Sequence, residues 1–164
     1  MILPDVLEVG LRIVFCGTAV GERSAKRGCY YAGPGNQFWP TLKKFGFVPE
    51  VFRPEDFRKL STHGLGLTDL VKLRSVNDAE LRTENFDVDG FRAKIVSFTP
   101  KALAFNGKKA AAVFLGRPVE YGLQEEGVGD TLIFVLPSTS GAARGFWDES
   151  YWMKLAEFNA EAAR

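Results

Sequence analysis

Four short apolar segments, separated by stretches of helical periodicity, most constrain the fold of this chain. They cover approximately residues 12–17, 63–71, 102–106 and 131–136. Short apolar runs bounded by turn residues are typical of buried strands, and strands that alternate with helices favour a parallel sheet. The sequence therefore predicts an α/β domain whose mostly parallel sheet is covered by helices on both sides.

Helices are expected between and after these segments, at approximately residues 37–45, 54–61, 89–98, 108–115 and 149–162. Asn36, Asp89 and Asp148 lie at the start of three of them, and Asn and Asp are favoured N-cap residues. Residues 75–88 are expected to be helical in part, and residues 117–124 to form a short extended segment.

A glycine-rich stretch, residues 17–39, lies between the first apolar segment and the first long helix. Open α/β sheets bind ligands in loops at the carboxyl ends of their strands, and glycines let a ligand approach the backbone closely. Tyr30 and Tyr31 offer flat faces for stacking. The basic residues that offer charge to an anion are Arg23, Lys26 and Arg27. We expect a ligand-binding loop here; the alternative is a surface loop stiffened by Pro34.

Length and composition indicate the size and class of the protein and exclude several kinds of site. With 164 residues and 46% hydrophobic content, a single domain spanning 1–164 and a monomer are expected. Lys and Arg (21) nearly balance Asp and Glu (20), so nucleic-acid binding would rest on local patches. Two cysteines and one histidine exclude a four-thiolate cluster and a multi-histidine metal site, and no cofactor is expected. Without a secretory signal or a run long enough to span a bilayer, we expect a soluble, cytoplasmic protein.

The two cysteines and the histidine have structural interpretations. Cys16 lies in an apolar run and is expected to pack in the core. Cys29 lies in the glycine-rich stretch, where packing is favoured over reactivity. His63 precedes the second apolar segment and is expected to be structural or peripheral rather than catalytic.

Five motifs follow one another along the chain: Val14-Phe15-Cys16-Gly17 with Gly21; Pro34-Gly35-Asn36-Gln37-Phe38-Trp39; Thr68-Asp69-Leu70-Val71; the strand and turn of 102–109; and Val135-Leu136-Pro137 followed by Ser140, Gly141 and Arg144. In this order they resemble the uracil-DNA glycosylase superfamily, and most closely its mismatch-specific uracil/thymine-DNA glycosylase branch. The resemblance covers nearly the whole chain. It implies a three-layer α/β/α sandwich around a central, mostly parallel sheet of four strands, acting on DNA without a metal.

Two positions depart from the motifs of that family. Its first motif reads Gly-x-Asn-Pro-Gly, and the Asn holds the attacking water; here residues 17–21 place Ala19 at that position. Its second motif usually reads Asn-Pro-Ser-Gly-Leu-Ser-Arg; here residues 138–144 place Ala142 where a larger wedge residue stands. A methyl group cannot orient water, and alanines fill a vacated base stack poorly. We therefore expect weaker dependence on the opposite guanine than in mismatch-specific relatives.

Asp69 is the leading catalytic candidate. It lies near the carboxyl end of the second apolar segment, where a strand is expected to end. Cleavage of a glycosidic bond builds positive charge on the sugar, which a carboxylate stabilises while it orients a water. We hypothesise that Asp69 replaces the missing Asn; the alternative is that it caps the following segment through local hydrogen bonds.

Asn106 and Tyr31 are the candidates for reading and stacking the base. Asn106, the second catalytic candidate, is expected to read the O4/N3 edge of uracil or to hold the water if Asp69 does not; its alternative is a turn before Gly107. Tyr31 matches the family's aromatic residue that stacks on the flipped base, and its alternative is a structural tyrosine. Backbone N–H groups around Tyr31 are expected to bind O2 of a departing uracil anion.

The remaining candidates surround this centre. Those expected to bind substrate are Gly17, Thr18, Ala19, Asn36 and Ser138. Those expected to contact phosphate or to form the wedge are Ser24, Lys26, Lys108, Lys109, Ser140, Gly141, Ala142, Ala143 and Arg144. Lys108 and Lys109 open an expected helix, and helix N-termini favour anions.

The resemblance implies a monofunctional DNA glycosylase in base excision repair. Such an enzyme flips uracil out of double- or single-stranded DNA, hydrolyses the N-glycosidic bond and leaves an abasic site, here in the nucleoid. A Schiff-base lyase needs a lysine at the reacting sugar, and neither core motif offers one. One alternative is a catalytically inactive protein that binds lesions or abasic sites. Another is a nucleotide-binding α/β domain, although the chain has no phosphate-loop or dinucleotide fingerprint.

Overall fold

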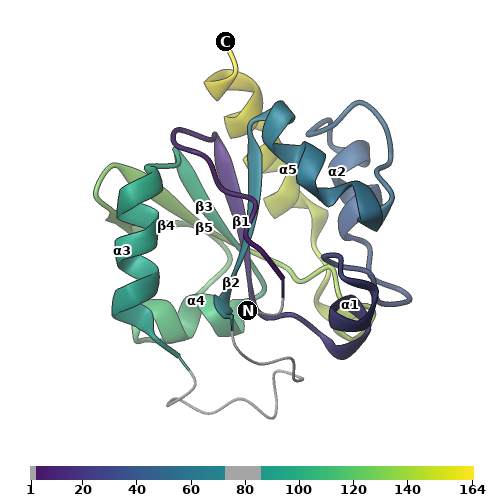
Figure 1. Ribbon diagram of the computed structural model, residues 1–164. Helices are drawn as coiled ribbons and strands as arrows, with labels where there is room; N and C mark the ends of the chain where they lie inside the picture. Colours follow the sequence, from purple (N-terminus) through teal and green to yellow (C-terminus); the bar gives the residue numbers. More distant parts are fainter. Residues whose placement is uncertain (1–2, 73–85) are drawn as a thin grey trace.

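A five-stranded sheet runs through the centre of the computed structural model, which describes residues 3–72 and 86–164 (Figure 1). The strands are β1 (Ile13–Ala19), β2 (Leu65–Val71), β3 (Ala102–Asn106), β4 (Gly122–Val128) and β5 (Thr131–Leu136). Their order is β2-β1-β3-β5-β4, and all neighbours are parallel except β4 and β5, which are antiparallel. The predicted α/β fold with a mostly parallel sheet is confirmed, and the predicted number of four strands was wrong.

The additional strand is β4, at the edge of the sheet. The sequence predicts a short extended segment at 117–124, whereas the strand occupies Gly122–Val128. An edge strand pairs on one side only, so it does not need the continuous apolar run of a buried strand. Most of β4 is exposed, and its register with β5 shifts between Leu123 and Gly127. Both features remove the pattern by which a strand is recognised.

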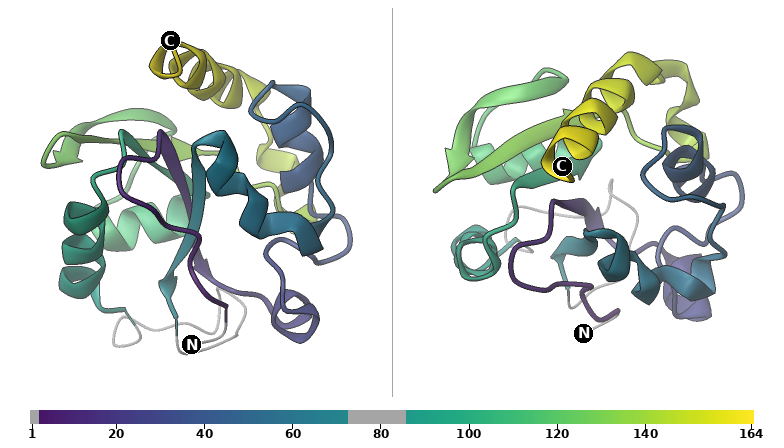
Figure 2. Two further views of the ribbon diagram at one scale, coloured as in Figure 1. Left: turned by 45° about the horizontal axis from the view of Figure 1, so that its top comes forward. Right: turned by 90° about the horizontal axis from the view of Figure 1, so that it is seen from above.

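Helices cover both faces of the sheet, with α3 and α4 on one face and α1, α2 and α5 on the other (Figures 1 and 2). The helical elements are α1 (Glu22–Arg27), α2 (Phe38–Lys44), the 3₁₀ helix η1 (Pro54–His63), α3 (Val88–Phe98), α4 (Lys108–Leu115), the 3₁₀ helix η4 (Gly141–Phe146) and α5 (Glu149–Ala162). No helix within residues 3–72 and 86–164 combines the length and the apolar character needed to cross a bilayer.

The predicted helices are present, with some differences. The 3₁₀ helix η4 lies outside the helices that the sequence predicts, and Gln37, not Asn36, is the N-cap residue of α2. Short α1 lies inside the glycine-rich stretch that the sequence predicts as loop. Asp87, and not Asp89, caps α3, because its carboxylate accepts the N–H of Gly90 at 2.9 Å. The helical content expected within 75–88 falls mostly outside the described residues.

Side chains alternate between two cores, one on each face of the sheet. Ile13 and Phe15 of β1 pack with α2 and α5, while Val14 and Cys16 pack with α3 and α4. On the first face, the fully buried Trp152 stacks on Phe15 at a centroid distance of 5.8 Å. Its Nε1 donates to the carbonyl of Pro137 at 3.0 Å, which ties α5 to the segment after β5. Cys16 and Cys29 are both buried, in agreement with packing roles.

The N-terminal segment is held against β2 by a backbone contact. Val6 and Leu67 exchange two N–H···O hydrogen bonds of 2.9 and 3.0 Å. A Cβ atom on Gly66 would overlap the carbonyl oxygen of Val6 and lie 2.8 Å from Cδ1 of Leu11. Gly66 is therefore required for the close approach of this segment.

We expect Gly66→Ala to lower the free energy of unfolding by about 1–3 kcal/mol, because the added methyl group displaces the N-terminal segment. Urea unfolding measures the change. Gly145→Ala is the matched control, since a Cβ there meets nothing within 4 Å. Equal unfolding free energies for Gly66→Ala and the wild type would contradict the expectation.

Candidate active site

A cleft of about 790 Å³ opens at the carboxyl ends of the parallel strands. Its walls come from the segments that follow β1, β3 and β5, from Asp69 of β2 and from the Tyr30–Asn36 loop. Parallel strands end at the same edge of a sheet, so segments far apart in sequence meet there. The expected gathering of the motifs at one site is therefore present.

Asp69 forms part of the floor of this cleft. Only 3% of the residue is exposed. It pairs in register with Gly17 of the neighbouring strand β1. A Cβ atom on Gly17 would lie 3.2 Å from Oδ1 of Asp69 and 3.7 Å from the hydroxyl of Tyr31. Gly17 thus leaves room for both the carboxylate and the hydroxyl.

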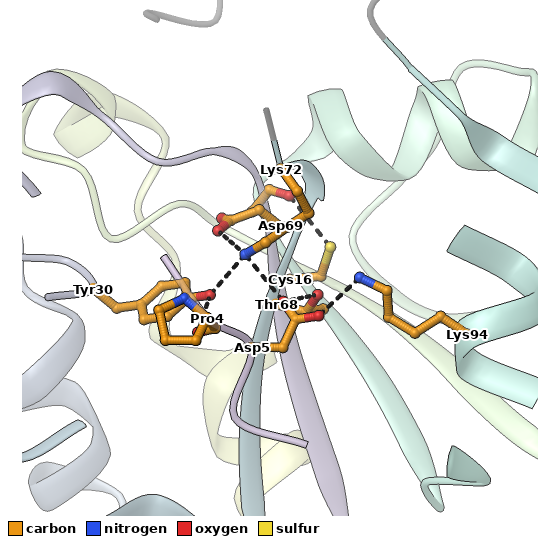
Figure 3. A network of polar contacts seen from close by, with 9 residues as sticks. Pro4, Asp5, Cys16, Tyr30, Thr68, Asp69, Lys72 and Lys94 are labelled. Carbon is orange, nitrogen blue, oxygen red and sulfur yellow. Dashed lines mark hydrogen bonds and ion pairs between the residues drawn. The ribbon is translucent and has the colours of Figure 1, made fainter. Parts of the chain in front are cut away.

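Lys72 lies behind Asp69 and connects it to the N-terminal segment (Figure 3). Its Nζ lies 3.3 Å from Oδ2 of Asp69 and 3.0 Å from Oδ1 of Asp5, and it donates to the hydroxyl of Tyr30 at 2.9 Å. Lys94 of α3 contacts the other oxygen of Asp5 at 2.8 Å. We call Asp5, Asp69, Lys72 and Lys94 the ion cluster; its formal charges cancel.

Burial and the neighbouring lysines together set the pKa values of the two carboxylates in the ion cluster. Desolvation raises the pKa of Asp69 to about 6, although the ion pair and hydrogen bond with Lys72 act to lower it. Burial would also raise the pKa of Asp5, but hydrogen bonds from Lys94 and Lys72 hold that pKa below its ordinary value. Asp69 is consequently ionised at neutral pH and can take a proton only slightly below it.

Tyr31 presents its ring and hydroxyl to the same cleft. Its backbone has a positive φ of 52°, which is uncommon for a residue with a side chain. Its ring stacks on Phe38, with centroids 4.0 Å apart and planes inclined by 24°. Its hydroxyl is hydrogen-bonded to Asn106, and burial raises the pKa of the Tyr31 phenol. One face of the ring is thus covered by the core while the residue lines the cleft.

Buried Thr139 fixes the amide of Asn106. Nδ2 of Asn106 donates to Oγ1 of Thr139 at 2.9 Å, and Oδ1 accepts the N–H of Thr139 at 3.1 Å. Oγ1 of Thr139 donates in turn to Oδ1 of Asn36 at 2.9 Å, and that oxygen also accepts the N–H of Phe38. Thr139, which the sequence analysis did not single out, therefore links the two predicted residues Asn106 and Asn36.

The structure brings most of the predicted residues to the cleft. Those that line it are Gly17, Thr18, Ala19, Ser24, Tyr31, Asn36, Asp69, Asn106, Lys108, Lys109, Ser138, Ser140, Gly141, Ala142 and Ala143. Lys26 of α1 and Arg144 are not among the lining residues, although Arg144 lies at the rim beside Gly35. His63 precedes β2, at the opposite end of the strand, and its ring packs against Phe52.

Several of these polar groups already have partners in the fold. The hydroxyl oxygen of Ser24 accepts the N–H of Ala32 at 2.9 Å, and that of Ser138 accepts the N–H of Ser140 at 3.1 Å. Lys108 lies over the ring of Tyr121 and 4.0 Å from Glu120. Ser24 and Ser138 therefore stabilise the backbone of their loops, a role that the sequence did not predict.

Sequence analysis also missed Lys72, Thr139 and Phe146. Lys72 is three residues after Asp69, which is a signal for a local ion pair, but its contact with Asp5 joins distant parts of the chain. Phe146 lines the cleft with 72% of its surface exposed. In the part of the chain that the structure describes, no three His, Cys, Asp or Glu side chains gather to hold a metal ion.

Replacing Asp69 by Asn is expected to stabilise the protein at pH 8. The pKa of Asp69 is raised from 3.8 to about 6, so folding favours the protonated carboxyl and the wild type loses stability as pH rises from 4 to 6. The Asp69→Asn variant has no carboxylate to ionise, so its free energy of unfolding should exceed that of the wild type by up to about 3 kcal/mol at pH 8. At pH 4 the two free energies should be equal. Urea unfolding at both pH values measures the difference.

The control for this experiment is Asp130→Asn, because Asp130 is an exposed carboxylate in the turn between β4 and β5. It should leave stability unchanged at both pH values. A less stable Asp69→Asn at pH 8 would mean that the pairing with Lys72 outweighs burial.

Comparison with known proteins agrees with this architecture. Residues 4–161 match the sequence model of the uracil DNA glycosylase superfamily. The fold is similar to the solution NMR structure of a Methanosarcina acetivorans protein provisionally described as a uracil DNA glycosylase, with a TM-score of 0.64, 24% identity and 96% of each chain covered. The predicted superfamily is confirmed, and it supports a DNA glycosylase activity. The chain belongs to the uracil DNA glycosylase superfamily.

Proposed function

We propose that the protein is a monofunctional uracil-DNA glycosylase of base excision repair, related to the mismatch-specific branch. It flips uracil out of double- or single-stranded DNA, hydrolyses the N-glycosidic bond and leaves an abasic site. The observation that carries the proposal is the buried carboxylate of Asp69, at the floor of a cleft built from the superfamily's motifs. A protein that only binds lesions has no need for a buried charge at this position.

Asp69 acts on the sugar in this proposal. As the bond to uracil breaks, the base leaves with the bonding electrons and positive charge develops on the sugar ring. The carboxylate stabilises that charge and orients a water toward C1′. The water adds to C1′ and its proton passes to Asp69, whose pKa of about 6 suits a proton acceptor near neutral pH. Asp69 thereby takes the role of the Asn that the family's first motif has at the position of Ala19.

Tyr31 and Asn106 bind the base. The flipped uracil stacks on Tyr31, whose other face is supported by Phe38. Thr139 uses one hydrogen of the Asn106 amide group and one lone pair of its oxygen. The remaining lone pair suits the N3–H donor of uracil, and O4 of uracil competes with the hydroxyl of Tyr31 for the second hydrogen. Backbone N–H groups around Tyr31 bind O2 of the departing anion.

The state of Lys72 supports hydrolysis rather than a lyase reaction. A Schiff base requires a neutral amine in contact with the sugar. Lys72 is instead held by ion pairs with both Asp69 and Asp5, and it does not line the cleft where the sugar would lie. The lysine nearest to Asp69 therefore serves as a counter-charge.

Single-turnover excision of uracil from an oligonucleotide tests the function. The wild type is expected to release uracil with a rate that rises with pH and levels off above about 6. Asp69→Asn and Asp69→Ala should lower the plateau rate by about 10²–10⁴-fold, the usual worth of an acid–base group. Asp130→Asn is the control and should match the wild type.

The other outcomes identify other functions. A wild type that excises nothing but binds abasic or uracil-containing DNA tightly would favour the lesion-binding alternative. Asp69→Ala with most of the wild-type rate would remove Asp69 from the mechanism and leave Asn106 as the candidate for holding the water.

Lys72→Met is expected to shift the pH profile of excision upward. Lys72 lowers the pKa of Asp69, so its loss lets burial raise that pKa beyond about 6. The rate should fall at pH 6–7 and recover at higher pH, whereas Asp69→Ala should not recover. Lys72→Arg, which keeps the charge, should retain a profile near that of the wild type. An unchanged profile in Lys72→Met would contradict the role of Lys72.

A further inference from the structure

Phe146 is a large apolar side chain that solvent reaches almost freely. It ends η4, and 72% of its surface is exposed. Among the large apolar side chains exposed in the described parts of the chain, it is the one that lines the cleft. Ala142 and Ala143 line the cleft beside it. An aromatic ring exposed at a cleft is available to stack on a ligand that enters the cleft.

The backbone on both sides of Phe146 is anchored. Ahead of it, the hydroxyl oxygen of Ser140 accepts the N–H of Ala142 at 3.3 Å, and a Cβ on Gly141 would lie 3.3 Å from the carbonyl oxygen of Gly35. After it, the N–H of Trp147 donates to the carbonyl of Arg144 at 3.2 Å. The ring of Trp147 packs on the buried Trp152 at 6.1 Å. Phe146 therefore projects from a fixed support.

The charges of the cleft favour nucleic acid as the ligand. The basic residues that line it are Arg23, Lys108 and Lys109, and the acidic ones are Glu22 and the buried Asp69. Arg144 adds a positive charge two residues before Phe146. A duplex presents flat base faces next to phosphates, so an aromatic ring in a cleft that cations also line matches both parts of it.

We infer that Phe146 enters the base stack of duplex DNA when a nucleotide is flipped into the cleft, and that it does so in place of the short Ala142. This inference rests on the proposed function. The phenyl ring is long enough to stack on a base that has lost its neighbour, which the methyl groups of Ala142 and Ala143 are not. It has no hydrogen-bonding atom, so it supports extrusion without selecting the base opposite.

Excision from duplex and single-stranded substrates separates this role from catalysis. Single-stranded uracil needs no filling of a vacated stack. We expect Phe146→Ala to slow single-turnover excision from U·A and U·G duplexes by about tenfold or more, the usual effect of removing one aromatic–base stack. Excision from single-stranded DNA should keep the wild-type rate. Phe146→Leu should give an intermediate loss on the duplexes.

Leu123→Ala is the matched control, because Leu123 is exposed by 58% on β4 and does not line the cleft. It should leave all rates unchanged. Phe146→Ala should also melt with the wild type, since its ring is exposed. An equal loss on duplex and single strand, or no loss at all, would overturn the inference.

A binding experiment keeps the inference testable if the wild type excises nothing. A duplex with a tetrahydrofuran abasic analogue and an adjacent 2-aminopurine reports on insertion through fluorescence. The wild type should change the fluorescence on binding, and Phe146→Ala should bind without that change. The same fluorescence change in both proteins would overturn the role of Phe146. Failure of excision by the wild type alone would overturn only the proposed function.

Discussion

The buried carboxylate of Asp69 is the constraint on which the rest of the site depends. Removing a charge from water costs several kcal/mol unless a counter-charge is well placed. Lys72 supplies that charge, but Asp5 shares Lys72, and Lys94 of α3 holds Asp5. One buried carboxylate therefore requires the N-terminal segment, β2 and α3 to be in place together. Gly66 does not line the cleft, but it contributes to this arrangement because it permits the close packing of the N-terminal segment.

The sequence predicts the parts of the fold whose signals are local. Buried strands appear as continuous apolar runs, and four of the five strands were found in this way. Because parallel strands end at one edge, the residues after each run had to meet, and Asp69, Asn106 and Tyr31 do line one cleft. Their roles in catalysis and base binding stay predictions, since geometry alone brings them together without showing what they do.

The features that the sequence did not predict depend on distance or exposure. The contact between Lys72 and Asp5 joins residues far apart in the chain, and no periodicity encodes it. Strand β4 is an exposed edge without an apolar run. The sequence did not indicate Phe146, because the family's motif places the wedge residue at the position of Ala142. In the structure, the ring of Phe146, four residues later, lines the same cleft. A lost side chain can be replaced by a neighbour in the fold without a match in the motif.

In the proposed mechanism, the change from an Asn on β1 to an Asp on β2 alters the chemistry as well as the position. The two strands are adjacent, with Ala19 opposite Val71 and Gly17 opposite Asp69, so groups from either strand reach the same cleft. An amide orients water at any pH and carries no charge. A carboxylate also stabilises the positive sugar and accepts a proton, but only while it is ionised. Burial brings that limit to about pH 6 and makes the fold less stable above it. The same buried position thus places Asp69 in the cleft, as the proposed mechanism requires, and opposes its ionisation, which Lys72 favours.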